Sequence, residues 1–202
     1  MEPLHLIVGL GNPGAEYAKT RHNAGFWLVE SLAQRWRAGW ALEKKFNARL
    51  AKAESGERSV LLCEPQTFMN SSGEAVAAVA KYFRVTPAEM LVAVDDADLP
   101  LGQLRLRPGG SSGGHHGLES IEQHLGTREF ARLRIGIGRL DGAREITNFV
   151  LGRFSPAEAK RAEAVLTVAA DQAECWCTAG IQKAMNQFNG IVTDSDNERK
   201  QQ

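Results

Sequence analysis

A short apolar segment that runs directly into a glycine-rich loop constrains the fold more than any other feature of this sequence. The segment is LHLIVGL at 4–10, and it leads into GLGNPG at 9–14. An apolar run of this length with β-branched residues predicts a buried strand. The following segment, 25–37, carries apolar residues at four-residue spacing, which predicts an amphipathic helix. A strand, a loop and a helix in this order favour an α/β fold.

The rest of the chain continues this alternation of strands and helices. We predict further strands at 46–53, 59–64, 91–94, 101–107 and 131–138. We predict further helices after the loop at 66–73 and at 118–125, about 155–178 and 181–188. Residues 139–152 have no clean period, which is typical of a mobile flap over a site and of an ordinary surface loop. We therefore expect one α/β domain over 1–190, followed by a polar C-terminal tail over 191–202.

Composition sets limits on the class of protein. A chain of 202 residues can bury a full core without disulfides or metal, and its odd count of three cysteines indicates reduced thiols. No apolar run approaches the roughly 18 residues that span a bilayer, and Met1–His5 lacks the basic region of a signal peptide. We therefore expect a cytosolic protein with no membrane partner.

Charge is balanced overall but not along the chain. The 24 basic and 24 acidic side chains give a net charge of zero, which indicates no particular partner. Arginine is nevertheless concentrated after residue 104, and its guanidinium pairs well with phosphate oxygens. Solvated strand edges and helix faces explain the same enrichment equally well. The arginines are Arg105, Arg107, Arg128, Arg132, Arg134, Arg139, Arg144 and Arg153.

Four polar side chains occupy positions at which loops meet predicted elements. His22 precedes the first helix, Asp95 follows a predicted strand, Asn12 lies in the first glycine-rich loop and Asn70 precedes another helix. Carboxyl ends of strands line the ligand crevice in open α/β sheets. A neutral imidazole can take a proton from water while a carboxylate orients it and amides donate to the developing oxyanion. These residues therefore predict a site for hydrolysis by activated water.

Other chemistries fit the residues less well. GLGNPG matches the dinucleotide fingerprint, but the acidic residue expected about 20 positions later is replaced by Gln34. Ser111 and Ser112 lack the strand-elbow context of a serine nucleophile. His115 and His116 lack the spacing of a zinc site, so we expect no metal. These patterns alone leave a hydrolase and a ligand-binding α/β domain open.

Seven ordered blocks over about 4–188 make the sequence resemble bacterial-type peptidyl-tRNA hydrolases. The blocks are GLGNPG at 9–14, Tyr17, TRHNAG at 20–25, TFMN at 67–70, VDDADLP at 94–100, GGSSGGHHGL at 109–118 and LRIGIG at 133–138. The resemblance implies a single three-layer α/β/α domain around a twisted mixed β-sheet. It also implies a monomeric cytosolic esterase that cleaves the bond between a stalled peptide and the 3′ end of its tRNA, without metal or cofactor.

The resemblance also implies roles for individual residues. His22 matches the proton acceptor, and Asp95 matches the residue that stabilises its basic form. Asn12 matches the residue that distinguishes N-blocked from free aminoacyl-tRNA. The expected substrate contacts are Tyr17, Phe68, Met69, Asn70 and His116, and the expected tRNA contacts are Arg105, Arg107 and Arg134.

One departure from the family pattern concerns the second glycine-rich loop. The family usually has Gly-His-Asn-Gly, whereas this chain has Gly114-His115-His116-Gly117. A neutral imidazole offers one donor and one acceptor where the family has an amide, so we expect the substrate contact of His116 to survive in altered form. A non-catalytic RNA-binding relative with the same fold is the main alternative. A nicotinamide-dependent oxidoreductase would depend on GLGNPG alone.

Overall fold

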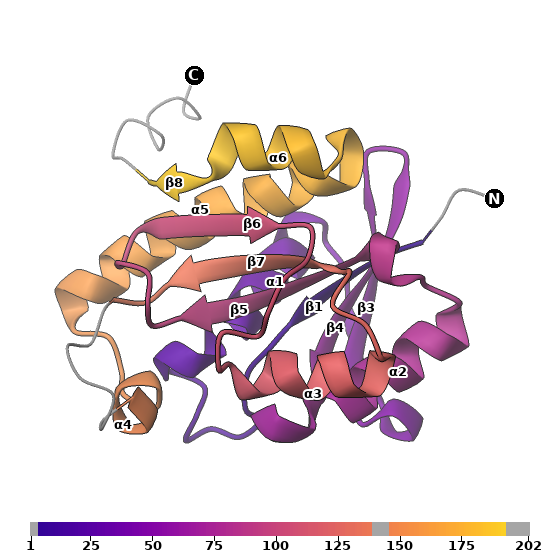
Figure 1. Ribbon diagram of the computed structural model, residues 1–202, viewed down its shortest axis with the longest axis horizontal. Helices are drawn as coiled ribbons and strands as arrows, with labels where there is room; N and C mark the ends of the chain where they lie inside the picture. The colour runs from indigo at the N-terminus through magenta and orange to yellow at the C-terminus, as the bar shows by residue number, and fades with distance from the viewer. Residues whose placement is uncertain (1–3, 139–145, 193–202) are drawn as a thin grey trace.

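The computed structural model describes residues 4–138 and 146–192, and within them one mixed sheet organises the chain (Figure 1). The strand order is β2-β3-β4-β1-β5-β7-β6-β8. The central strands β4, β1, β5 and β7 are parallel, whereas β2, β3, β6 and β8 add antiparallel pairs at the two edges. The strands are β1 (His5–Gly9), β2 (Trp40–Glu43), β3 (Ala48–Ser55), β4 (Arg58–Pro65), β5 (Met90–Asp96), β6 (Gln103–Arg107), β7 (Ala131–Gly136) and β8 (Gly190–Ile191).

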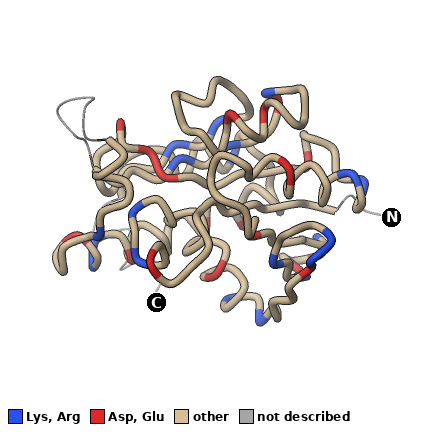
Figure 2. Tube along the Cα trace, turned by 90° about the horizontal axis from the view of Figure 1, so that it is seen from below, with Lys and Arg blue, Asp and Glu red and all other residues tan. Residues whose placement is uncertain are grey.

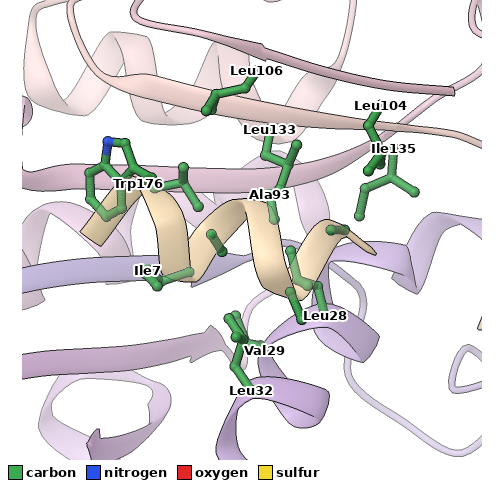
Figure 3. Packing of buried hydrophobic residues seen from close by; sticks show 14 of the residues in the cluster. Ile7, Leu28, Val29, Leu32, Ala93, Leu104, Leu106, Leu133, Ile135 and Trp176 are labelled. Atoms are coloured by element: carbon green, nitrogen blue, oxygen red, sulfur yellow. The ribbon is translucent and has the colours of Figure 1, made fainter. Parts of the chain in front are cut away.

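Helices cover both faces of the sheet and form two separate core layers. The helices are α1 (Ala24–Arg35), α2 (Ser72–Phe83), α3 (His116–Leu125), α4 (Ile146–Val150), α5 (Pro156–Ala179) and α6 (Ile181–Phe188). Side chains of α1 and α5 form one cluster with alternate residues of the strands, and Figure 3 shows Leu28, Leu133 and Trp176 within it. Side chains of α2 and α3 form the second cluster on the opposite face. The alternation of strand side chains between faces is what supplies both layers.

The predicted α/β architecture is confirmed, and most of the predicted elements are present. The differences are short elements at the periphery. β2 and β8 are additional edge strands, and α4 occupies 146–150 within the segment interpreted as a flap or a loop. Residues 139–145 of that segment lie outside the described residues. Ile191 pairs with Gln103 and Val192 is buried, so the sheet continues past the expected boundary at residue 190.

A contact between two glycines sets how closely α1 approaches the sheet. A Cβ on Gly9, at the end of β1, would collide with the carbonyl oxygen of Gly25, at the start of α1. A Cβ on Gly25 would in turn collide with the backbone of Leu10 and Ala93. The first turn of α1 therefore lies directly against the ends of β1 and β5. This contact brings the loop before α1 to the carboxyl edge of the parallel strands.

Surface charge and hydropathy add two observations. Basic and acidic residues are interspersed along the chain instead of separating onto opposite faces (Figure 2). This distribution agrees with the net charge of zero. Among the described helices, none combines the length and the apolar character required to cross a membrane.

Candidate active site

His22 and Asp95 meet at the carboxyl edge of the sheet. His22 lies in the 3₁₀ turn Arg21–Asn23 that precedes α1, and Asp95 is the second-last residue of β5. The Nδ1 atom of His22 is 2.9 Å from Oδ1 and 3.0 Å from Oδ2 of Asp95. Because an ionised carboxylate only accepts hydrogen bonds, Nδ1 carries the proton and the neutral ring keeps its lone pair on Nε2. The tautomer required of a general base is therefore set by Asp95.

A second imidazole contacts the same carboxylate. His115 Nε2 lies 3.2 Å from Asp95 Oδ1, and the His115 side chain is buried. His115 also caps α3, because its Nδ1 accepts a hydrogen bond from the backbone N–H of Leu118 at 3.4 Å. Since Nδ1 accepts, Nε2 is the nitrogen that donates to Asp95. The cap therefore fixes which nitrogen of His115 faces the site.

The two imidazoles determine the charge state of Asp95. The side chain of Asp95 is only 2% exposed, and burial by itself raises the pKa of a carboxyl group. His22 and His115 outweigh this effect and hold the pKa of Asp95 well below its ordinary value of 3.8. Asp95 is therefore a carboxylate throughout the neutral range, and it can balance a positive charge that develops on His22.

Asn12 is fixed by hydrogen bonds from both its side chain and its backbone. Its Oδ1 accepts a hydrogen bond from the backbone N–H of Met69 at 2.8 Å, and its backbone N–H and C=O both bond the side chain of Asn23. Asn23 is next to His22, so this network ties the first glycine-rich loop to the loop of the histidine. With Oδ1 occupied, the N–H groups of Nδ2 are what Asn12 presents to the cavity.

These side chains open into a cavity of about 230 Å³. Asn12, His22, Asp95 and His115 line one part of it. Another part of the lining, the apolar wall, comes from α4 and the residue after it and is apolar apart from the hydroxyl group of Thr147. Figure 1 shows α4 on the side toward which the arrows of β5 and β7 point, which is the edge of the sheet that carries the site. The wall residues are Ile146, Thr147, Val150 and Leu151.

Comparisons with known proteins identify the family. The family model for peptidyl-tRNA hydrolase matches residues 6–199. The chain belongs to the peptidyl-tRNA hydrolase family. The peptidyl-tRNA hydrolase of Gloeobacter violaceus is 49% identical over 92% of this chain and 94% of its own. That of Brevibacillus brevis is 42% identical over 93% of this chain and 99% of its own. The crystal structure of peptidyl-tRNA hydrolase from Acinetobacter baumannii has a TM-score of 0.89 and 38% identity, covering 94% of this chain and 96% of that one.

The position of His115 beside Asp95 was not predicted from the sequence, where His115 was considered only as a zinc ligand. Its contact with Asp95 joins residues that are 20 positions apart, and two adjacent histidines give no indication of which one faces inward. The available signal was its place directly before α3, where a side chain can cap the helix. Potential ligand atoms of His22, Asp95 and His115 lie within 4.8 Å of one another and could hold a metal ion. Hydrogen bonds between the same atoms already account for their proximity.

The expected substrate-contacting residues separate into two groups. Met69 is buried next to Asn12, and a Cβ on Gly117 would lie 2.6 Å from its sulfur. Phe68 is 61% exposed and packs edge-on against Tyr17, with the ring centroids 6.4 Å apart. Asn70 is exposed in the next turn and is not among the residues that line the cavity. The structure therefore places Phe68, Tyr17 and Asn70 outside the cavity, on the accessible surface.

His116 lies at the rim of the cavity and makes a different contact from His115. Its side chain is 75% exposed, and its Nδ1 lies 3.1 Å from a carboxylate oxygen of Glu119. The hydrogen bond from His116 is the main cause that lowers the pKa of Glu119. His116 therefore points toward solvent and toward Glu119 on α3. Asp95 is not among the described groups that its side chain contacts.

Four arginines form a compact array on one face of β6 and β7. Arg105 pairs with Arg134 across the two strands, and Arg107 pairs with Arg132. Arg132 is buried and bonds Ser111, Glu122 and Arg128, while Arg134 bonds Asp96 and the carbonyls of Ser111 and Ser112. Arg105 and Arg107 are exposed. The inner pair thus holds the second glycine-rich loop, and the outer pair faces solvent. Of the other expected arginines, Arg139 and Arg144 lie outside the described residues.

Proposed function

We propose that this chain hydrolyses the ester bond between a peptide, or an N-blocked aminoacyl group, and the 3′ end of tRNA, with His22 as the general base. The observation that carries the proposal is the pair of contacts from His22 Nδ1 to the Asp95 carboxylate at 2.9 and 3.0 Å, in a family member. They leave Nε2 free to accept a proton in the cavity. Translation supplies such substrates in the cytoplasm, where the proposal places the protein.

The reaction proceeds through one proton acceptor and one tetrahedral intermediate. His22 Nε2 removes a proton from water as the water oxygen bonds to the ester carbonyl carbon. The imidazolium that forms is stabilised by Asp95, whose pKa stays below its ordinary value. When the intermediate collapses, the bond from carbon to the ribose oxygen breaks and the imidazolium returns its proton to that oxygen. The products are a free carboxylic acid and a tRNA with a free 3′ end.

Asn12 has the geometry to assist at the carbonyl side. The bond from Met69 N–H to its Oδ1 orients the amide so that Nδ2 faces the cavity. A preorganised N–H donor stabilises the charge that develops on a carbonyl oxygen. The same donor can bond the carbonyl group that an N-blocked substrate has and a free aminoacyl group lacks. This supports a role for Asn12 in both rate and selectivity.

We assign binding of the rest of the substrate to the surface around the cavity. The exposed Arg105 and Arg107 can pair with tRNA phosphates, whereas most of the donors of Arg134 are already used within the protein. Exposed Phe68 with Tyr17 offers a face on which a base can stack. Met69, Asn70 and His116 complete the proposed contact surface.

The test measures release of N-acetylated amino acid from its tRNA, with unblocked aminoacyl-tRNA as the control substrate. We expect cleavage of the blocked substrate by wild type, and a decrease in kcat of about 10² to 10⁴-fold for His22→Ala, because the general base is lost. His124→Asn is the matched histidine control, since His124 bonds the Ser120 carbonyl on α3 and does not line the cavity. Binding of tRNA without cleavage by wild type would instead support the RNA-binding alternative.

A further inference from the structure

Arg21, which directly precedes His22, connects the catalytic loop to the segment around α4. Its guanidinium carbon lies 4.5 Å from the ring centroid of Phe149 and 4.8 Å from that of Phe154. Its Nη2 atom is 3.3 and 3.2 Å from the two carboxylate oxygens of Glu158, at the start of α5. Arg21 is only 9% exposed. A cation held between two rings and a carboxylate is fixed in position and largely desolvated.

The backbone repeats the connection that the side chain makes. The N–H of Arg21 donates to the carbonyl of Gly152 at 3.0 Å, and Thr20 forms an antiparallel bridge with Arg153. Gly152 also leaves space for the guanidinium, since a Cβ there would lie 3.0 Å from Nη1 of Arg21. The side chain and the backbone of Arg21 therefore both contact the segment that follows α4.

Residues of α4 and the adjacent Leu151 form the apolar wall of the cavity. Ile146, Thr147, Val150 and Leu151 face the space into which His22 and Asp95 open. Phe149, which contacts Arg21, belongs to the same short helix. A shift of α4 away from Arg21 would change the distance between this wall and the imidazole. The position of the wall relative to His22 therefore depends on the contacts of Arg21.

We propose that Arg21 is a positioning residue for substrate binding, which acts by fixing α4 and its apolar wall against the loop that carries His22. The inference rests on the function proposed above. Arg21 does not line the cavity, so it acts through α4 and not by contact with substrate. Both the planar stacking surface and the forked donors are needed, and lysine supplies neither.

The experiment compares Arg21→Met, Arg21→Lys and Arg35→Met in hydrolysis of N-acetyl-aminoacyl-tRNA. Arg35 is the matched control because it also joins two helices by ion pairs, to Asp171 at 2.7 Å and Glu174 at 3.1 Å, without lining the cavity. We expect Arg21→Met to raise KM about tenfold with kcat within about threefold of wild type, because the wall is displaced while the base is intact. The increase in KM for Arg21→Lys should be more than half of the increase for Arg21→Met. Arg35→Met should leave KM unchanged.

A second variant tests the same contact from the α4 side. Phe149→Leu removes one of the two rings that hold the guanidinium, so it should also raise KM, and the double variant should show no further increase. If Arg21→Met does not fold, Phe149→Leu decides by the same criterion. An unchanged KM in these variants would overturn the inference, and so would a loss confined to kcat, since Arg21 would then act on His22 directly. Absence of cleavage by wild type would refute the proposed function instead.

Discussion

Two buried carboxyl groups at the same edge of the sheet have pKa values shifted in opposite directions. Glu64 lies near the carboxyl end of β4 and Asp95 near that of β5, and both strands are parallel to β1. In both strands, the residues two and four positions earlier belong to the same core cluster. Glu64 and Asp95 therefore lie on the same face of the sheet. Both are almost inaccessible, at 0% and 2% exposure. Burial raises the pKa of Glu64 from 4.5 to about 7, whereas the pKa of Asp95 is lowered.

The difference lies in the number of partners. Both oxygens of Asp95 contact His22, and Oδ1 also contacts His115. Glu64 has one strong partner, Arg49 at 2.7 Å, and its Oε1 has no hydrogen-bond partner among the described groups. Glu30, on the other side of Arg49 at 3.6 Å, competes for the same guanidinium and further raises the pKa of Glu64. Burial thus leaves a carboxylate charged only where enough donors converge on it.

The largest expected effect comes from removing the charge of Asp95, the carboxylate with more hydrogen-bond partners. Asp95→Asn should lower kcat by about 10² to 10³-fold, because the amide cannot balance the imidazolium and can stabilise the wrong tautomer of His22. Single-turnover hydrolysis of N-acetyl-aminoacyl-tRNA measures it. A near-normal rate would show that His22 does not need an anionic partner.

The next effect concerns stability between pH 4.5 and about 7, the range in which Glu64 titrates. A raised pKa means that the folded state holds its proton more tightly than the unfolded state, so stability is lost as pH rises from 4.5 through about 7. Glu64→Gln should remove about 3 kcal/mol of this pH dependence. Urea unfolding of both proteins between pH 4.5 and 8 measures the difference. Parallel stability curves would contradict the prediction, and activity at neutral pH should be unchanged.

A smaller effect is expected when Asp95 loses one of its two imidazole partners. His115→Ala should lower kcat about tenfold, since Asp95 keeps its bonds to His22 but loses a donor. His115→Gln should restore part of the rate, because its amide can donate in place of Nε2. Equal losses in the two variants would indicate that His115 acts only as the cap of α3.

The smallest effect is expected at the imidazole that does not reach Asp95. His116→Asn should change KM by about two- to threefold with kcat unchanged, because His116 lies at the rim and contacts Glu119. Steady-state kinetics over a range of substrate concentrations resolves this change. Identical KM and kcat values would remove His116 from the proposed contact surface.

The parts of the fold that could be predicted from sequence are those with a long local pattern. The spacing of apolar residues in α1 and the apolar runs of β1 and β5 predict all three elements before any tertiary contact is considered. β2 and β8 have four and two residues, too few for a period, and they form only because β3 and β6 offer an edge. α4 is similarly short and depends on Arg21 and its neighbours.

Site residues could be predicted where their position next to a recognisable helix or strand places them. They could not be predicted where a contact with a residue distant in the sequence determines the direction of the side chain. His22 before a helix and Asp95 at a strand end follow from local position, although their roles stay predictions. The inward direction of His115 depends on its bond to Asp95 and on the cap of α3. Arg134 is held within the protein whereas Arg105 faces solvent, because Arg134 donates to the carbonyls of Ser111 and Ser112. No pattern in the sequence of β7 indicates these bonds.

The backbone contact between Gly9 and Gly25 has a consequence for the evolution of such a chain. The loop that carries His22 is held against the strands mainly by contacts between backbone atoms, with one methyl group of Val29 also packed at Gly9. Leu28, which is not part of this contact, should therefore accept other apolar residues with a loss of stability but little change in the position of the loop. Substitutions can therefore accumulate in the core during evolution with little effect on the position of His22.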